Sequence, residues 1–223
     1  MRILSRSLAI ALTIIAYSVH IVFSTENVMS KVAIAHLVGL TPYSQSKFHN
    51  TPKLNKELPD AYEERTHRER IHADSGGKTF VPNMALKNAL SEAAKFLGEQ
   101  IPGKGKSTWT KHFEAGILCI EPMYLMDLDG KPILKDDWVG EWGFYPADGV
   151  RGSGKRVQKC YPVIYKWQGM AEFLVYDDTI TEDVLKRHLE QAGRLIGIGR
   201  FRPRNNGYFG RFKVAELEWR DEN

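Results

Sequence analysis

The sequence predicts an α+β protein with a ferredoxin-like, RNA-recognition-like core that carries inserted loops or strands. Two strand–helix units support this fold class. The first is an apolar strand at Val32–Leu40, followed later by a helix at Met84–Leu97. The second is a strand at Glu172–Tyr176, a helix after it and a last strand at Arg211–Trp219. A repeated strand–helix–strand pattern of this kind is typical of the ferredoxin-like fold.

The two helices are the best-supported elements, because apolar residues recur on one face of each. Gly98 is the expected C-cap of the first helix. Thr179 and Glu182 have capping-box spacing at the start of the second. The buried faces are expected to be Leu86, Leu90, Ala93 and Leu97 in the first helix and Leu185, Leu189, Ala192 and Ile196 in the second.

Shorter elements are expected between these units. The polar segment Thr41–Asp60 contains three prolines and is expected to be a loop. Tyr62–His72 alternates acids and bases, with Glu64 and Arg68 four residues apart, which favours a solvated helix or a polar strand. The other expected strands are Lys78–Val81, Gly116–Ile120, Val139–Tyr145, and a pair formed by Cys160–Trp167 and Ala171–Tyr176 around a turn at Gln168-Gly169.

A loop rich in glycine and arginine follows the second helix and is the strongest functional signal. No acid occurs between Glu190 and Glu216. Arginine forks fit phosphate, glycines let a backbone approach a ligand, and aromatic faces stack on bases. A solvated hairpin explains this composition less well than contact with single-stranded nucleic acid. The expected contacts are Gly197, Gly199, Arg200, Arg202, Arg204, Gly207, Tyr208 (or Phe209), Gly210, Arg211 and Lys213.

Two further basic stretches extend this expected interface. Lys104 and Lys106 lie near Trp109, and a Gly/Ser-rich loop carries Arg151, Lys155 and Arg156. Each stretch alone is more typical of a soluble loop. If all three loops share a face, they form a groove of about 10 positive charges suited to a polyanion.

Composition places the chain among ordinary globular proteins. It has 223 residues, of which 43% are hydrophobic and 26% are charged, which excludes a disordered or fibrous class. A net charge of +4 is too small to indicate nucleic-acid binding by itself. Cys119 and Cys160 have no CxxC partner and lie in apolar runs, so we expect buried thiols and neither a zinc site nor a disulfide.

Sharper catalytic and cofactor motifs fail. Gly98–Lys104 has P-loop spacing, but Gly105 stands where a Ser or Thr would hold Mg²⁺. Gly197-Ile198-Gly199 ends a helix and lacks the third glycine of a dinucleotide fingerprint. Asp127 and Asp129 are better explained by a turn before Gly130 than by a metal site. We expect no cofactor, no metal and no assigned catalytic residue.

Histidines keep an enzymatic alternative open. His67 and His72 lie among arginines, and a histidine beside cations can act as the base in metal-independent RNA cleavage. A surface histidine in a charged segment is the simpler interpretation. His188 is expected to pack on its own helix.

The N-terminal segment, residues 1–28, is expected to be either signal-like or a mis-started hydrophobic stretch. Arg2 and Arg6 precede an apolar run at Leu8–Phe23, which resembles a signal peptide or a short anchor. Met29 is a second plausible start. Residues 29–223 would then form a single cytoplasmic domain. Retention of residues 1–24 would instead imply an exported or membrane-anchored protein that binds anionic surfaces.

Two segments resemble the repeat-associated mysterious protein (RAMP) superfamily of CRISPR systems. One runs from Val81-Pro82 through Leu86-Lys87 to Leu90, and the other is the loop Gly197–Phe212. Asn83-Met84-Ala85 departs from the Gly-Ser-Ser usual in that family, and the loop has a longer, more polar centre. The compact chain from Met29 onward also looks like a product of phage or prophage origin.

The resemblance implies a ferredoxin-like fold with the glycine-rich loop after the last helix, and a role in RNA binding. We therefore expect a non-enzymatic binding protein for single-stranded RNA, or less favourably DNA. The expected partners are that strand and other protein subunits or further copies of the chain along it. The alternatives are the metal-independent endoribonuclease and the envelope-associated protein described above.

Overall fold

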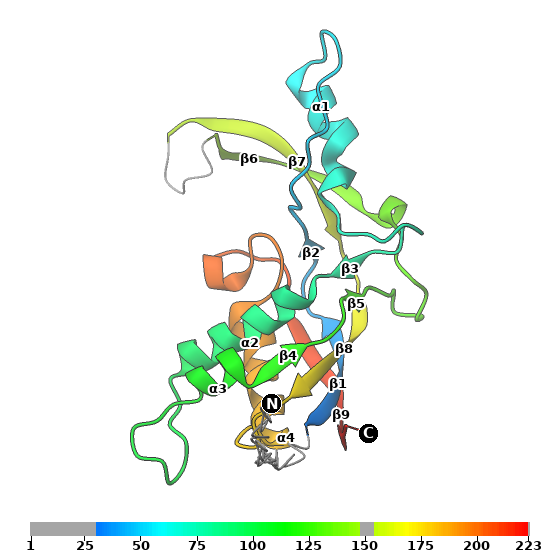
Figure 1. The fold of residues 1–223 in the computed structure, drawn as a ribbon. Coiled ribbons are helices and arrows are strands. Elements are labelled where there is room, and N and C mark those ends of the chain that lie inside the picture. Colours follow the sequence, from blue (N-terminus) through cyan, green and yellow to red (C-terminus); the bar gives the residue numbers. More distant parts are fainter. Residues whose placement is uncertain (1–29, 148–153, 223) are drawn as a thin grey trace, which may run out of the picture.

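A four-stranded antiparallel sheet forms the centre of the molecule, in the strand order β4-β8-β1-β9 (Figure 1). The computed structural model describes residues 30–147 and 154–222. The strands of this sheet are β1 (Lys31–Gly39), β4 (Ile117–Cys119), β8 (Gln168–Val175) and β9 (Phe212–Asp221). Helix α2 (Asn83–Leu97) lies between β1 and β4 in the chain, and α4 (Glu182–Gln191) lies between β8 and β9. This order and these connections confirm the predicted ferredoxin-like fold.

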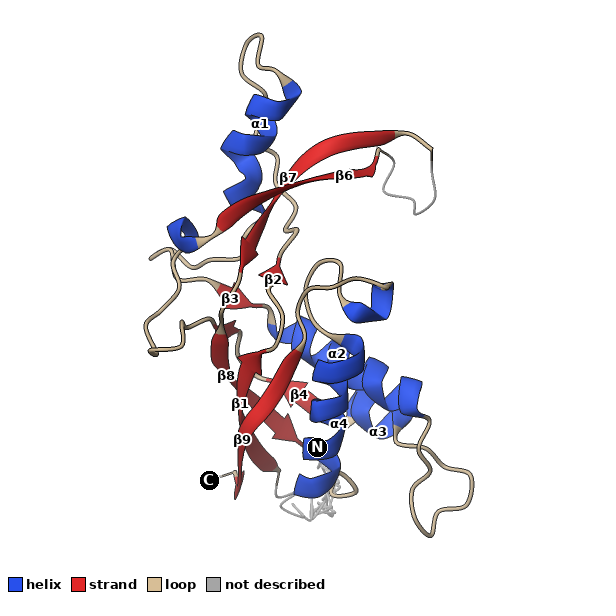
Figure 2. Ribbon diagram, turned by 180° about the vertical axis from the view of Figure 1, so that it is seen from behind, coloured by secondary structure: helices blue, strands red, loops and turns tan. Residues whose placement is uncertain are grey.

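Both long helices pack on the same face of the sheet (Figure 2). Alternate residues of β1, including Ala33, Ala35 and Leu37, are fully buried in the same core cluster as the helices. The predicted buried residues Leu185, Leu189, Ala192 and Ile196 are all inaccessible to solvent. Their stripe continues past the end of α4 because a π-helical turn, Ala192–Ile196, extends it.

The sequence predicts the C-terminal end of α2 correctly but not the N-terminal end of α4. Gly98 has a left-handed φ of 59° and donates its N–H to Ala94 O, so the predicted C-cap of α2 is confirmed. The predicted capping box is wrong, because α4 begins after Thr181, whose side chain makes no capping bond. Thr179 lies one turn earlier, where its N–H donates to Asp177 Oδ1 at 2.9 Å.

The insertions form a second body of structure at one end of the sheet. A three-stranded sheet has the order β2-β7-β6, from β2 (Tyr43–Ser44), β6 (Val139–Pro146) and β7 (Arg156–Ile164). The β6–β7 hairpin and α1 (Pro59–Thr66) project away from the ferredoxin-like core (Figure 1). The smaller elements are β3 (Phe80–Val81), β5 (Met123–Tyr124), α3 (Thr110–Ala115) and short 3₁₀ turns at His67–Arg70, Lys135–Asp137 and Pro203–Asn205.

The predicted strand pair around Gln168-Gly169 is wrong. The two strands belong to different sheets, because β7 pairs with β6 and β2 whereas β8 pairs with β1 and β4. Trp167 redirects the chain between the sheets: its ring is fully buried, and its Nε1 donates to Thr41 O at 3.0 Å. Gly169 is the second residue of β8 and is needed because a Cβ there would lie 2.6 Å from Tyr124 O.

The charged segment at 62–72 is a helix, one of the two predicted alternatives. It forms the end of α1 and the following 3₁₀ turn, and the ion pairs are not those suggested by the spacing of Glu64 and Arg68. The buried Glu63 instead contacts Arg70 at 2.8 Å and Lys159 of β7 at 3.3 Å. The charges therefore fasten α1 to the hairpin.

Candidate nucleic-acid interface

The glycine-rich loop folds back on the segment around β2. Ile198 N donates to Gly210 O at 3.0 Å, which closes the loop at its base. Gly210 N donates to Pro42 O at 2.7 Å, and Arg200 N donates to Ser44 O at 2.8 Å. The loop is therefore held by backbone hydrogen bonds to itself and to the chain after β1.

The loop glycines are explained by this close packing. Gly199 has φ +77°, and a Cβ there would lie 2.3 Å from Tyr43 Cε2. Gly210 has φ +76°, and its Cβ would lie 1.9 Å from Ile198 O. Added Cβ atoms at Gly197 and Gly207 would likewise meet Pro203 and Phe201. These glycines are required by the protein's own fold, so they do not by themselves indicate a ligand.

The arginines of the loop differ in what they contact. The Arg200 guanidinium lies 3.5 Å from the ring centroid of Tyr161 and 4.5 Å from that of Tyr145, both on the β6–β7 hairpin. Arg202 forms an ion pair with Glu92 of α2 at 2.7 Å. Arg204 is exposed, with its guanidinium 5.8 Å from the Phe96 ring centroid.

Of the other loop residues that were predicted to contact nucleic acid, some lie at the surface and one is buried. Arg211 Nε donates to Arg194 O at 3.3 Å, and Lys213 is exposed on β9. Tyr208 is 58% exposed, and its ring meets that of Phe209 edge to face with centroids 5.8 Å apart. Phe209 was the alternative stacking residue, and that expectation is wrong because it is only 7% exposed.

A small depression lies where the loop meets the beginning of α2. Its volume is about 160 Å³. The basic residues Lys47, His72 and Arg200 line it, and among the described residues that line it there is no acid. The whole lining is Tyr43, Gln45, Ser46, Lys47, His72, Pro82, Ala85, Gly199 and Arg200. The positive end of the 15-residue helix α2 adds to the field there.

A second, larger cavity of about 720 Å³ lies further along α2. Glu92, Lys95 and Phe96 of the helix form one wall, and Arg202, Arg204 and Asn205 of the loop form the other. The glycine-rich loop thus runs along α2 and bounds both hollows.

The three basic loops do not all meet. Lys104 and Lys106 lie in the connection beyond the C-terminal end of α2, where Lys104 Nζ donates to Thr179 Oγ1 at 3.4 Å (Figure 1). A helix of this length spans about 22 Å, which separates these lysines from the depression. The expectation that all three loops share one groove is not met for this loop.

The hairpin strands reach the glycine-rich loop through Tyr145 and Tyr161, the two rings that Arg200 contacts. Arg156 pairs in register with Pro146, so its side chain lies on the opposite face of the hairpin, where its Nη1 donates to Phe144 O at 3.4 Å. Lys155 precedes it at the end of the described hairpin. Arg151 lies outside the described residues.

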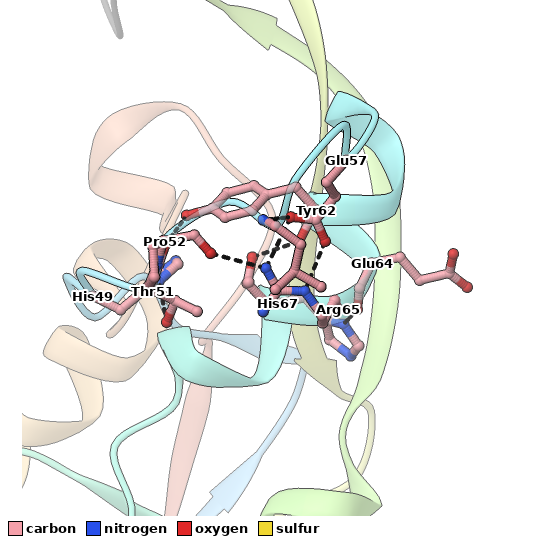
Figure 3. A network of polar contacts seen from close by, with 10 residues as sticks. His49, Thr51, Pro52, Glu57, Tyr62, Glu64, Arg65 and His67 are labelled. Carbon is pink, nitrogen blue, oxygen red and sulfur yellow. Dashed lines mark hydrogen bonds and ion pairs between the residues drawn. The ribbon is translucent and has the colours of Figure 1, made fainter.

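His67, one of the two histidines considered as a catalytic base, is held inside the fold beside α1 (Figure 3). It is 7% exposed, and its Nδ1 donates to Glu64 O at 2.6 Å. The same close-up shows Arg65 bound to Glu57 through bonds of 2.7 and 2.9 Å. That guanidinium lowers the pKa of Glu57 to about 2. Of the two histidines considered as bases, only His72 lines the depression, where burial and then Lys47 lower its pKa.

Other predicted polar residues have structural roles. Asp127 Oδ1 accepts from the N–H groups of Asp129 and Lys131, which confirms the turn. His188 is fully buried, and its Nδ1 donates to Val184 O of its own helix, as the predicted packing there implies; its ring also lies 4.4 Å, centroid to centroid, from Phe113 of α3. Cys119 and Cys160 are both buried. In residues 30–147 and 154–222, no group of three His, Cys, Asp or Glu side chains is arranged to hold a metal ion.

Several residues at these hollows were not predicted. Lys47 lies in a segment that reads only as polar loop, and Tyr145 and Tyr161 read as ordinary strand residues. No local pattern would have selected them, because the sheet pairing and the folded loop bring them together. Glu92 was within reach of prediction, since it lies at helical spacing before Lys95 and Phe96.

No helix in the described part of the chain has the length and apolar character needed to cross a membrane. The expectation of a signal or anchor falls on residues 1–28, which lie outside the described residues.

No protein-family model matches the chain, and a comparison with curated proteins gives no match. Two solved structures are similar. One is a cryo-electron-microscopy structure of type III-B Cmr-beta bound to cognate target RNA, at TM-score 0.48 and 10% identity. The match covers 87% of this chain and spans 62% of that one. The other is Cmr6 from Pyrococcus furiosus, at TM-score 0.45 and 10% identity, covering 83% of this chain and 99% of that one.

These likenesses are distant. The ferredoxin-like assignment rests on the strand order and connections of this chain itself. The suggested phage or prophage origin stays a prediction.

Proposed function

We propose that this chain binds single-stranded nucleic acid, RNA in preference to DNA, without cleaving it. The observation that carries the proposal is the acid-free depression between the glycine-rich loop and the start of α2, lined by Lys47, His72 and Arg200. Its 160 Å³ is smaller than the ~300–1,000 Å³ of sites that enclose a small molecule. A hollow of this size and charge fits a phosphodiester group of a strand that continues on either side.

The proposed path of the strand follows the loop. Arg200 lies between the depression and the hairpin, so it can hold a phosphate while its guanidinium plane stays against Tyr161. Tyr208 and Phe201 expose 58% and 45% of their surfaces and offer faces for bases. Lys155 extends the positive charge along the hairpin, whereas Arg156 lies on its opposite face. The preference for RNA follows from the resemblance of Val81–Leu90 and Gly197–Phe212 to the RAMP superfamily.

A pair of double variants of the full chain tests this proposal. Lys47→Gln/Arg200→Gln removes two charges from the depression, and Lys104→Gln/Lys106→Gln removes two from the loop beyond α2. Each phosphate contact with a single strand contributes about 0.7 to the slope of log K against log salt. We expect the first variant to bind a labelled single-stranded RNA more weakly, with the slope reduced by about 1.4. The second should match the wild type.

Thermal melting of both variants shows whether each one is folded. Equal slopes for the wild type and the folded depression variant would remove the depression from the site.

A second candidate function, a metal-independent endoribonuclease, is favoured by one observation. His72 lines the depression beside Lys47 and Arg200, and its lowered pKa favours the neutral imidazole, which is the form that can accept a proton. Incubation of RNA with the protein in excess chelator tests it. Cleavage that is lost in His72→Ala and kept in His49→Ala would establish the enzyme. Intact RNA under conditions of saturated binding would exclude it.

The domain division is part of the same proposal: residues 29–223 are one domain, and residues 1–28 are dispensable for binding. N-terminal sequencing of the native protein tests the division. A chain that begins at Met29 or Ser30 agrees with it, and one that begins at Thr25 would favour export and binding to anionic surfaces.

A further inference from the structure

We infer that the larger cavity along α2 is a pocket for a guanine base of the bound strand. The inference rests on the proposed function and adds a base preference to it. The pocket is lined by Glu92, Lys95, Phe96, Arg202, Arg204 and Asn205. Its volume of about 720 Å³ lies within the ~300–1,000 Å³ typical of sites for small organic groups.

The pocket has a stacking surface. Phe96 is 56% exposed although it lies on a helix that packs on the core. The Arg204 guanidinium is 5.8 Å from the Phe96 ring centroid and is itself exposed. An aromatic ring and a guanidinium plane are the two surfaces on which unstacked bases are usually held. A base can therefore lie against Phe96 with Arg204 at its edge.

Glu92 supplies the polar recognition. It is on the same face of α2 as Lys95 and Phe96, at spacings of three and four residues. Its Oε1 accepts from Arg202 Nη2 at 2.7 Å, and Arg202 Nη1 also contacts Gly197 O at 3.5 Å. The Arg202 side chain is 19% exposed and that of Glu92 is 35% exposed. Arg202 thus holds the carboxylate in place, while the carboxylate stays accessible from the cavity.

A fixed carboxylate selects among the bases by their hydrogen-bond donors. A carboxylate can only accept hydrogen bonds. Guanine presents two adjacent donors, N1–H and the N2 amino group, which match the two oxygens of a carboxylate. Adenine and cytosine present one amino group beside a ring-nitrogen acceptor, and uracil presents one N–H between two carbonyls. Those acceptors face the carboxylate unfavourably. Lys95 at the rim carries the charge needed for a neighbouring phosphate.

The test uses the full chain and labelled eight-residue RNAs of uridine in which one central base is changed. A bidentate pair discriminates by about 1–3 kcal/mol, so we expect guanine to bind roughly tenfold more tightly than adenine, cytosine or uracil at that place. Inosine, which lacks the N2 amino group, should lose most of this advantage. Glu92→Gln should abolish the preference for guanine and keep binding of the all-uridine strand. Glu99→Gln, which changes another acid near the end of α2, is the matched control.

The outcomes separate the pocket from the proposed function. Equal binding of the four strands by the wild type would overturn the pocket and leave strand binding intact. A guanine preference that survives in folded Glu92→Gln would also overturn it. Absence of binding to every strand would refute the proposed function. Guanosine monophosphate is titrated alone in parallel. If it binds in a Glu92-dependent way while the strands show no preference for guanine, the pocket takes a free nucleotide. That result would overturn the inference that the pocket holds a base of the bound strand.

Discussion

Gly199 shows at the scale of one residue why the loop is rich in glycine. Two constraints exclude a side chain there: the positive φ of the backbone and the close approach of Tyr43. A comparison with Gly105 measures the first constraint without the second. Gly105 also has positive φ, at +60°, but a Cβ there would meet nothing within 4 Å. We expect Gly105→Ala to cost about 1–2 kcal/mol of stability through the backbone alone. Gly199→Ala should cost a further ~1–3 kcal/mol through overlap with Tyr43 and Ser44.

Chemical denaturation of the two variants measures this difference. If both variants lose the same stability, the close approach of the loop to Tyr43 is not a feature of the folded protein. If Gly199→Ala folds normally but loses RNA binding, the glycine serves the ligand instead.

His188 gives the clearest pH dependence. Burial lowers its pKa below the usual 6.5, and its Nδ1 donates to Val184 O at 2.8 Å. The unfolded chain therefore binds a proton more readily than the folded one as pH falls below 6.5. The stabilisation is complete above that pH and is lost as pH falls through the folded-state pKa. We expect the free energy of unfolding to fall as the pH drops below about 6.5, and less steeply in His188→Phe.

Urea denaturation across this pH range checks the sign. Equal pH slopes for the wild type and His188→Phe would show that other groups, such as His72, account for the whole effect.

Prediction from the sequence succeeds for residues whose burial follows from periodicity. The faces of α2 and α4 could be predicted because a helix carries its own pattern. Phe209 could not be placed, because the burial of a loop aromatic depends on how the loop folds over Pro42 and Phe201. For the same reason the arginines of the loop looked alike in the sequence, yet Arg202 is paired with Glu92 while Arg204 is exposed.

At the scale of elements, Glu63 joins α1 to the hairpin. Its side chain is 8% exposed and contacts Arg70, Lys159 and the Cys160 N–H. Removal of one partner from a buried ion pair typically costs about 3–5 kcal/mol, because the other charge is left unpaired. We expect Glu63→Ala to lose about that much stability. The exposed neighbour Glu64 is the control, and Glu64→Ala should change stability by less than about 0.5 kcal/mol.

Differential scanning calorimetry of both variants checks this prediction. Equal melting temperatures would mean that the charges at Glu63 do not hold the hairpin.

The element that the sequence misplaced is the strand pair at 160–176. Both strands are apolar and adjacent in the chain, so a hairpin was the simplest expectation. Alternation of apolar residues shows which side of a strand is buried, but it does not show which sheet the strand joins. The long-range pairing of β7 with β6 and of β8 with β1 decides that.

At the scale of the whole molecule, charge is distributed unevenly around a chain with little net charge. The formal net charge is +4. Lys104 and Lys106 follow the C-terminal end of α2, whereas the depression lies at its start. The fold class could be predicted because two strand–helix units are strongly patterned. The candidate site could be predicted in the glycine-rich loop and at Lys155. The hairpin tyrosines, Lys47 and Glu92 could not be predicted, since they come from separate insertions and elements that meet only in the folded chain.

Lysine footprinting of the full chain, with and without bound single-stranded RNA, would locate the strand on the protein. The acetylation of each lysine is read by mass spectrometry. We expect RNA to protect Lys47 and Lys155 and to leave Lys104 and Lys106 as reactive as in the free protein. Protection of Lys104 and Lys106, with Lys47 still fully reactive, would contradict this expectation and place the strand beyond the far end of α2.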